Sequence, residues 1–134
     1  MIVLAFIFSV TLSAQSSGTV YDVVEQMPYF PGGEDSMRHF LLHHLQYPEY
    51  SKNHHIEGRV DVRFVVDETG AISHITIQKG EIGDINAEAI RVVRSFPPFE
   101  PGIHDGKAVK VTVILPIIFQ LDESELGDKR KTKP

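Results

Sequence analysis

The sequence predicts a two-layer α+β domain with the element order helix, strand, strand, helix, strand. Two observations support this prediction: apolar residues alternate with polar ones over residues 58–66 and 109–121, and they recur with a helical period over residues 37–45 and 85–96. A helix between the second and third strands favours a right-handed crossover that makes these strands parallel. We therefore expect a three-stranded mixed sheet in the order 2-1-3, with both helices on one face and the third strand at an edge.

The first helix is expected to begin after the glycine turn at residues 31–33, because Glu34 and Asp35 place negative charge at its N-terminus. It is expected to end before Pro48, since the residue that precedes a proline is disfavoured in the helical region. The apolar face of this helix consists of Met37, Phe40, Leu41 and Leu45.

A β-hairpin follows the first helix. Gly58 opens a strand in which every second residue is apolar up to Val66, and residues 67–70 form a turn. The return strand spans residues 72–78 and directs Ile75 and Ile77 toward the core.

The second helix is expected to be capped by the side chain of Asp84 or Asn86. It is expected to end before Pro97 and Pro98, which cannot continue a helix. Its apolar stripe consists of Ile85, Ala89, Val92, Val93 and Phe96. Its outer face consists of Glu88, Arg91 and Arg94.

The third strand is the longest, because every odd position from Val109 to Leu121 is apolar. Pro116 lies within it and has no N–H group for a sheet ladder, which favours an edge strand or a bulge. The remaining residues, 122–134, contain four acidic and four basic side chains and a single apolar residue, so we expect a disordered charged tail.

The N-terminal residues 1–14 are interpreted as a signal peptide or a truncated hydrophobic leader. Residues 2–10 are almost wholly apolar, yet this run is shorter than the about 20 residues that a membrane span needs. The small residues Ser13 and Ala14 precede Gln15 and provide a cleavage point. An N-terminal strand is the alternative interpretation, and residues 15–26 are interpreted as a tether.

Composition and missing motifs exclude several function classes. The chain has 134 residues and no cysteine, which excludes a disulfide and a cysteine nucleophile, and its net charge of −5 does not predict a nucleic-acid partner. The sequence contains no Gly-x-Ser-x-Gly and no glycine-rich phosphate motif, so we expect neither catalysis nor a cofactor. His39 and His43 lie four residues apart, but no third ligand accompanies them and we expect no metal site.

Short motifs occur in a characteristic order through the domain: MPYFPGG at 27–33, YP at 47–48, IEGRV at 56–60, VDETGAI at 66–72, AIRVV at 89–93, FEPG at 99–102 and LPIIF at 115–119. In these motifs the chain resembles the C-terminal domain of TonB, in the variant common in Bacteroidetes-type envelope proteins. The resemblance implies that residues 27–121 form a TonB C-terminal-like domain with the element order derived above.

The resemblance also implies a function. Members of the family are non-catalytic, lie in the periplasm, and couple an inner-membrane motor to outer-membrane receptors in energy-coupled transport. They bind a receptor segment, the TonB box, as an added strand on their last strand. The matching peptide-binding edge here consists of Val109, Lys110, Val111, Thr112, Val113, Ile114 and Leu115. Accessory peptide contacts are expected at His44, Gln46, Tyr47 and Pro48.

The short tether leaves an alternative open. An extended residue spans at most about 3.6 Å, so residues 15–26 are too few to cross a periplasm, and membrane contact would need a further N-terminal segment. The chain is then expected to be a stand-alone envelope domain. It would bind a receptor peptide, or it would act as a scaffold or homodimer that uses the same edge strand.

Overall fold

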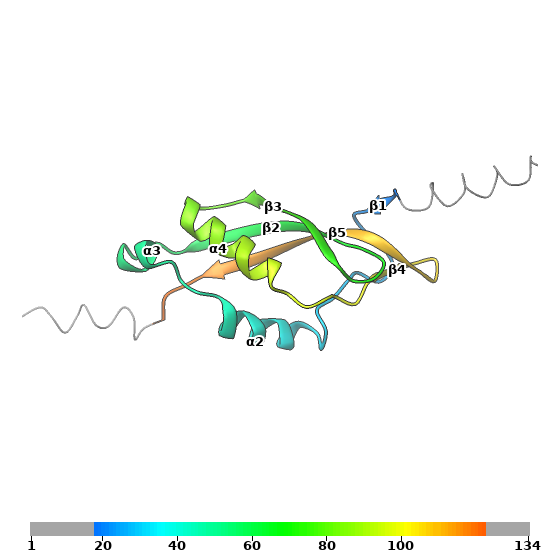
Figure 1. Cartoon of the computed structure of the whole chain (residues 1–134), viewed down its shortest axis with the longest axis horizontal. Coiled ribbons are helices and arrows are strands. Elements are labelled where there is room, and N and C mark those ends of the chain that lie inside the picture. The colour runs from blue at the N-terminus through cyan, green and yellow to red at the C-terminus, as the bar shows by residue number, and fades with distance from the viewer. Residues whose placement is uncertain (1–17, 123–134) are drawn as a thin grey trace, which may run out of the picture.

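The computed structural model describes residues 18–122, so the predicted leader (1–14) and, apart from Asp122, the predicted tail lie outside the described residues. In Figure 1, β5 runs along the length of the molecule, with β1 and β4 at one end and α3 at the other. The predicted α+β class is confirmed. In chain order the elements are β1 (Val20–Tyr21), α2 (Glu34–His44), α3 (Glu49–Asn53), β2 (Gly58–Val66), β3 (Ile72–Lys79), α4 (Gly83–Arg94), β4 (Gly102–His104) and β5 (Lys107–Phe119).

The sheet has five strands, so the prediction of three strands is wrong in number. Its order is β1-β5-β2-β3, and β4 pairs with β5 outside this path. The three predicted strands are neighbours in the predicted order, β3-β2-β5, but the third is not the edge of the sheet, because β1 pairs with β5 on its other side. The unpredicted strands β1 and β4 contain two and three residues, which is too short for an alternating pattern. β1 lies within the segment that was interpreted as a tether.

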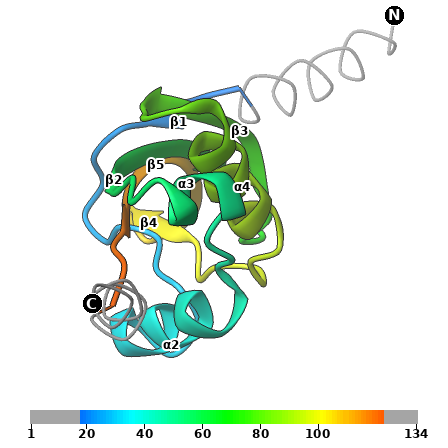
Figure 2. The same ribbon diagram turned by 90° about the vertical axis from the view of Figure 1, so that its left-hand side faces the viewer.

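The core lies between one face of the sheet and the helices. The buried side chains of β2 alternate along the strand, and the odd-numbered residues of β5 lie beside them in the antiparallel register. α4 packs on β2 and β3, as Figure 2 shows from the end of the molecule. The core residues that these elements supply are Val60, Val62, Phe64, Val66, Ile85, Ala89, Val92, Val93, Ile117 and Phe119.

The helix α2 packs against the same core but less deeply. None of its residues is buried, whereas α4 buries five. Its apolar residues Met37, Phe40 and Leu41 are partly buried against the core cluster, which confirms the prediction of two helices on one face. The ring of Phe30 joins α2 to the core, because its centroid lies 5.6 Å from that of Phe40 and 5.5 Å from that of Phe96.

The turn between β2 and β3 holds the segment that leads into β4. An Asp67 carboxylate oxygen accepts hydrogen bonds from the backbone N–H of Thr69 at 2.8 Å and of Ala71 at 3.0 Å. The backbone N–H of Phe99 donates to the carbonyl oxygen of Gly70 at 2.9 Å. Gly70 has a φ of 89°, and a Cβ there would lie 1.9 Å from the carbonyl oxygen of Phe99, so this position requires glycine.

Two side-chain predictions for α4 are wrong. No side chain caps this helix, because Ile82 is the N-cap residue and Asp84 instead accepts hydrogen bonds from the hydroxyl of Ser51 at 2.9 Å. Glu88 was expected on the outer face but is buried. Its carboxylate accepts hydrogen bonds from the backbone N–H of Gln46 at 2.6 Å and from Arg91 at 2.5 Å, which satisfies the buried charge. Within residues 18–122, no helix is both long and apolar enough to cross a membrane.

Candidate functional site

The candidate site is the edge of β5 that faces away from β2. β2 pairs with β5 along residues 111–119, and β4 pairs with residues 107–109 beyond the end of β2. On the opposite edge, β1 pairs in parallel with Lys110 and Val111. We call residues 107–111 the closed half of β5 and residues 112–119 the open half. On the edge away from β2, the open half has no strand partner within the part of the chain that the structure describes.

The predicted peptide-binding edge is divided between these two halves. Val109 pairs with Gly102 of β4, and Lys110 and Val111 pair with β1. Thr112, Val113, Ile114 and Leu115 belong to the open half. The sequence predicts a continuous edge, because it contains no signal for β1, which covers Lys110 and Val111.

The side chains of the open half alternate between the core and the surface. Val113 and Leu115 lie in register with the buried Phe64 and Val62 of β2, so they face the core. Ile114 is 47% exposed and Ile118 is 65% exposed, and both lie on the outer face. Two large apolar side chains therefore project beside a backbone edge that has no strand partner among the described residues.

An apolar groove of about 700 Å³ lies between α2 and the end of the open half. Figure 1 shows α2 below this part of β5. The polar residues of the groove are Arg38 and Gln120, and its lining residue Leu42 is 74% exposed. The groove is lined by Arg38, Leu41, Leu42, Leu45, Tyr47, Pro116, Ile117, Ile118, Phe119 and Gln120.

Only Tyr47 among the four predicted accessory residues lines this groove. Its ring centroid lies 5.7 Å from that of Phe119, and its hydroxyl donates to the carbonyl oxygen of Ile56. His44 stacks on Phe40 instead, with ring centroids 3.9 Å apart. The structure places Gln46 and Pro48 around a different hollow, next to α4.

An ion pair between the buried carboxylate of Glu88 and the exposed side chain of Arg91 holds the segment that contains these accessory residues. Arg91 donates to Glu88 at 2.5 and 2.7 Å, and it also donates to the carbonyl oxygen of His44 at 2.7 Å. The hydrogen bond to Glu88 raises the pKa of Arg91. The i, i+3 spacing of Glu88 and Arg91 was a visible signal for this pair in the sequence. Because both partners are satisfied within the fold, we assign the pair to positioning the end of α2 rather than to chemistry.

Comparison with known proteins identifies the family. The family model described as the Gram-negative bacterial TonB protein C-terminal matches residues 43–121, which is more than half of the chain. The chain belongs to this family. TonB C-terminal domains are non-enzymatic domains of the Gram-negative envelope that are associated with energy-coupled transport and with outer-membrane receptors.

A solved structure of this family shares the fold. The chain is similar to a solution structure of the TonB C-terminal domain of Helicobacter pylori (residues 194–285), with 23% identity and a TM-score of 0.50, over 68% of this chain and 98% of that one. A longer version of the same domain (residues 179–285) has 24% identity and a TM-score of 0.49, over 69% of this chain and 88% of that one. No curated protein matches the chain significantly.

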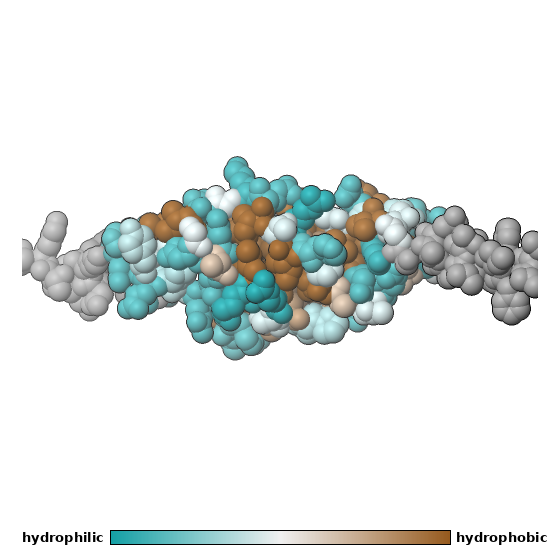
Figure 3. Space-filling model, turned by 45° about the horizontal axis from the view of Figure 1, so that its top comes forward, coloured by the Kyte–Doolittle hydropathy of each residue, from teal (hydrophilic) through white to brown (hydrophobic). Residues whose placement is uncertain are grey.

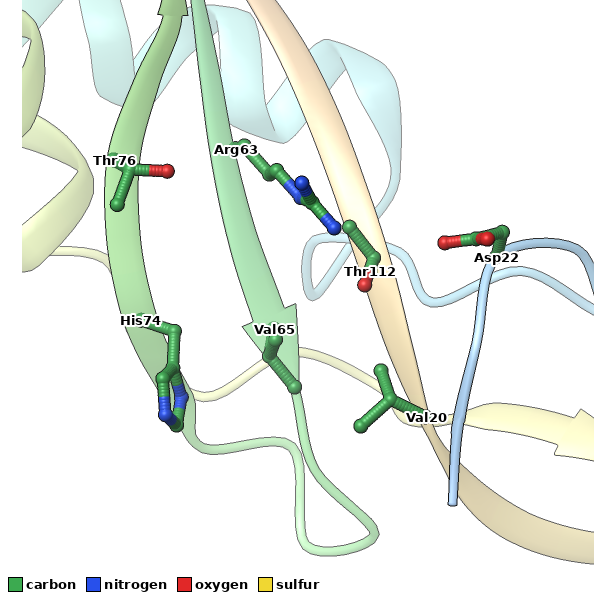
Figure 4. Close-up of a pocket in the computed structure, with 7 residues that line it drawn as sticks. All are labelled: Val20, Asp22, Arg63, Val65, His74, Thr76 and Thr112. Carbon is green, nitrogen blue, oxygen red and sulfur yellow. The ribbon is translucent and has the colours of Figure 1, made fainter. Parts of the chain in front are cut away.

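The outer face of this TonB C-terminal domain has a further, more polar hollow of about 490 Å³ beside β5. In Figure 4 the side chain of Arg63 extends across the sheet toward Thr112, with Asp22 beyond it and His74 on the far strand. Val20 of β1 borders the same hollow. The N-terminal segment thus covers part of the outer face as well as the edge of β5.

The surface has exposed apolar area but no metal cluster in the described part of the chain. Figure 3 shows hydrophobic side chains across the middle of one face, between hydrophilic ones. The rings of His39 and His43 are tilted by 40° with centroids 4.2 Å apart, and no third ligand joins them within residues 18–122. The apolar edge and groove are therefore the features on which we base a function.

Proposed function

We propose that this domain binds an extended peptide, the TonB box of an outer-membrane receptor, by β-strand addition to the edge of β5. The observation that supports this proposal best is the open half of β5. Its backbone edge has no described strand partner, and an apolar groove lies beside it. An edge of this kind accepts a peptide through backbone hydrogen bonds, while pockets for alternate side chains give specificity.

The position of Pro116 indicates which backbone groups face the peptide. Pro116 lies opposite Asp61 of β2 and has no N–H group, so its nitrogen fits the edge that faces away from β2. Backbone groups two residues apart on a strand point to the same edge. We therefore infer that Ile114 directs its N–H group toward the added peptide, which loses one hydrogen bond where it passes Pro116.

The side chains around the edge favour an apolar peptide. Peptide residues that face α2 would contact the groove at Leu42 and Leu45, and those on the other face would lie beside Ile114. The apolar area that such a peptide buries adds about 25 cal/mol per Å² to the backbone hydrogen bonds. We place this interaction in the periplasm, where an exported domain meets the inner end of an outer-membrane receptor.

The test is a titration of the full chain with a receptor-derived TonB-box peptide. Ile114→Pro should weaken binding at least about tenfold, because it removes an edge-facing N–H group and adds a steric block. Ile114→Ala is the matched control and should stay within about threefold of the unmodified chain, since it keeps the N–H group. Equal binding by the proline variant would show that the peptide does not use this edge.

The same open edge supports an alternative, in which two copies of the chain pair through β5 as a scaffold or homodimer. Light scattering of the full chain at high concentration distinguishes the two functions. A monomer that binds the peptide supports receptor binding. A dimer that Ile114→Pro dissociates, and that does not bind the peptide, supports the alternative.

A further inference from the structure

The strand β1 occupies part of the edge to which we assign peptide binding. Val20 pairs with Lys110 and Tyr21 pairs with Val111, both in parallel with β5. Lys110 and Val111 belong to the predicted peptide-binding edge and directly precede the open half. A backbone group that pairs with β1 is not available to a second strand, so β1 and a peptide that reaches this end compete for the same atoms.

β1 is held weakly, whereas the segment that follows it is anchored. The strand contains two residues, Val20 is 46% exposed and Val23 is 80% exposed. By contrast Val24 is 8% exposed, and Gln26 exchanges two backbone hydrogen bonds with Ile103 of β4, at 3.0 and 2.8 Å. The chain can therefore separate from β5 up to Val24 without loss of the buried contacts that follow.

Among the described residues, side chains in and after β1 contact His104. The ring of Tyr21 lies 5.2 Å from that of His104, and the Glu25 carboxylate lies 4.0 Å from the same imidazole. Val20 and Asp22 border the polar hollow near Arg63 (Figure 4). Release of β1 would thus uncover both the backbone of Lys110 and one side of this hollow.

We propose that β1 is an internal competitor strand that covers the first part of the peptide-binding edge and is displaced when a peptide binds. This inference rests on the proposed function, because it concerns the same edge. The parallel orientation of β1 indicates that the edge accepts a parallel strand, which can extend from the open half over Lys110 only after β1 leaves. The apparent affinity of the domain is then reduced by the fraction of molecules in which β1 is paired.

The first experiment weakens β1 in the full chain. The double substitution Val20→Pro and Tyr21→Pro removes both N–H groups of the strand and should strengthen binding of the TonB-box peptide about three- to tenfold, the effect of one or two backbone hydrogen bonds. Val23→Pro is the matched control, because it introduces proline at an exposed position outside the pair. This control should bind the peptide as the unmodified chain does.

The second experiment uses the unmodified full chain and measures amide hydrogen exchange with and without saturating peptide. The amides of β1 should exchange faster in the complex, while the amide of Ile114 should become more protected. Because it uses the unmodified chain, this measurement tests the proposal even if the double proline variant does not fold.

The outcomes separate the two proposals. If the peptide binds but the double proline variant gains no affinity and β1 stays protected in the complex, the competitor role is wrong and strand addition at the open half stands. If neither the unmodified chain nor the proline variants bind the peptide, the proposed function is wrong and the inference fails with it. Faster exchange of β1 in the complex, together with tighter binding by the variant, supports both.

Discussion

The two halves of β5 belong to one strand with one alternating pattern, yet they differ in their neighbours. The closed half pairs with β4, with β1 and, at Val111, with β2, whereas the open half pairs with β2 alone among the described strands. The odd positions from Val109 to Phe119 are apolar in both halves. The difference shows that the availability of an edge depends on short segments elsewhere in the chain as well as on the residues of the edge itself.

The two helices differ in how deeply they pack. α4 buries five residues and packs on β2 and β3. α2 buries none and contacts the core with partly buried side chains, which leaves the groove beside the open half. A loosely packed helix is thus part of the reason why this end of the sheet can accept another strand.

The largest predicted effect concerns the core side of the open half. Phe119→Ala should lower the free energy of unfolding by about 3–5 kcal/mol, because Phe119 is 1% exposed and its truncation leaves a cavity beside Tyr47. Ile118→Ala, at 65% exposure on the neighbouring position, should change it by no more than about 0.5 kcal/mol. Denaturant unfolding measures both.

This pair of variants tests whether the open half is packed on its core face and exposed on its outer face. Equal destabilisation by both variants would mean that Ile118 is packed in solution, for example against a second copy. The outer face of β5 would then be an interface, and the alternation of side chains along β5 would not predict which of them are exposed.

The next effect tests the closed half. A Cβ at Gly102 would lie 2.6 Å from a methyl carbon of Val111, so Gly102→Ala should destabilise the domain by about 1–3 kcal/mol. Gly83→Ala is the control, since its Cβ would meet no atom within 4 Å. Amide exchange should show the loss at residues 107–111 first. A uniform loss over β5 would contradict the division of the strand into two halves.

Much of the fold could be predicted because its long elements have clear periods. The alternation from Val60 to Val66 and from Val109 to Leu121 identified β2 and β5, and the crossover rule placed β2 between β3 and β5. β1, β4 and α3 were missed because two to five residues do not show a period. The proline at 48 followed by Glu49 was the available signal for the start of α3.

The site could be predicted only in part, for a physical reason. The alternation at Thr112, Val113 and Ile114 indicates a strand with two faces, but pairing at an edge depends on backbone groups that every residue has. No side chain in the sequence therefore indicates that β1 pairs with Lys110. Glu88 was misplaced for a related reason, because its burial depends on a backbone N–H group supplied by Gln46, 42 positions away.

The smallest effect tests whether the β2–β3 turn supports the closed half. The hydroxyl of Thr69 and, to a smaller extent, its backbone N–H donate hydrogen bonds that lower the pKa of Asp67. The carbonyl oxygen of the neighbouring Gly70 accepts a hydrogen bond from the backbone N–H of Phe99, ahead of β4. Asp67→Ala should reduce the free energy of unfolding at neutral pH by about 1 kcal/mol. Because the folded-state pKa is lowered, this stabilisation is present above the unfolded value of about 3.9 and is lost as the pH falls through the folded value.

Unfolding curves of the unmodified chain and of Asp67→Ala should therefore converge as the pH falls below about 4. Asp67→Asn separates charge from geometry, because its side-chain oxygen still accepts hydrogen bonds but does not titrate. We expect it to keep part of the stability at neutral pH and to lose the pH dependence. If Asp67→Ala also speeds amide exchange at Val109 and leaves Ile117 unchanged, the turn stabilises the closed half selectively. Equal acceleration at both residues would mean that the two halves of β5 open together.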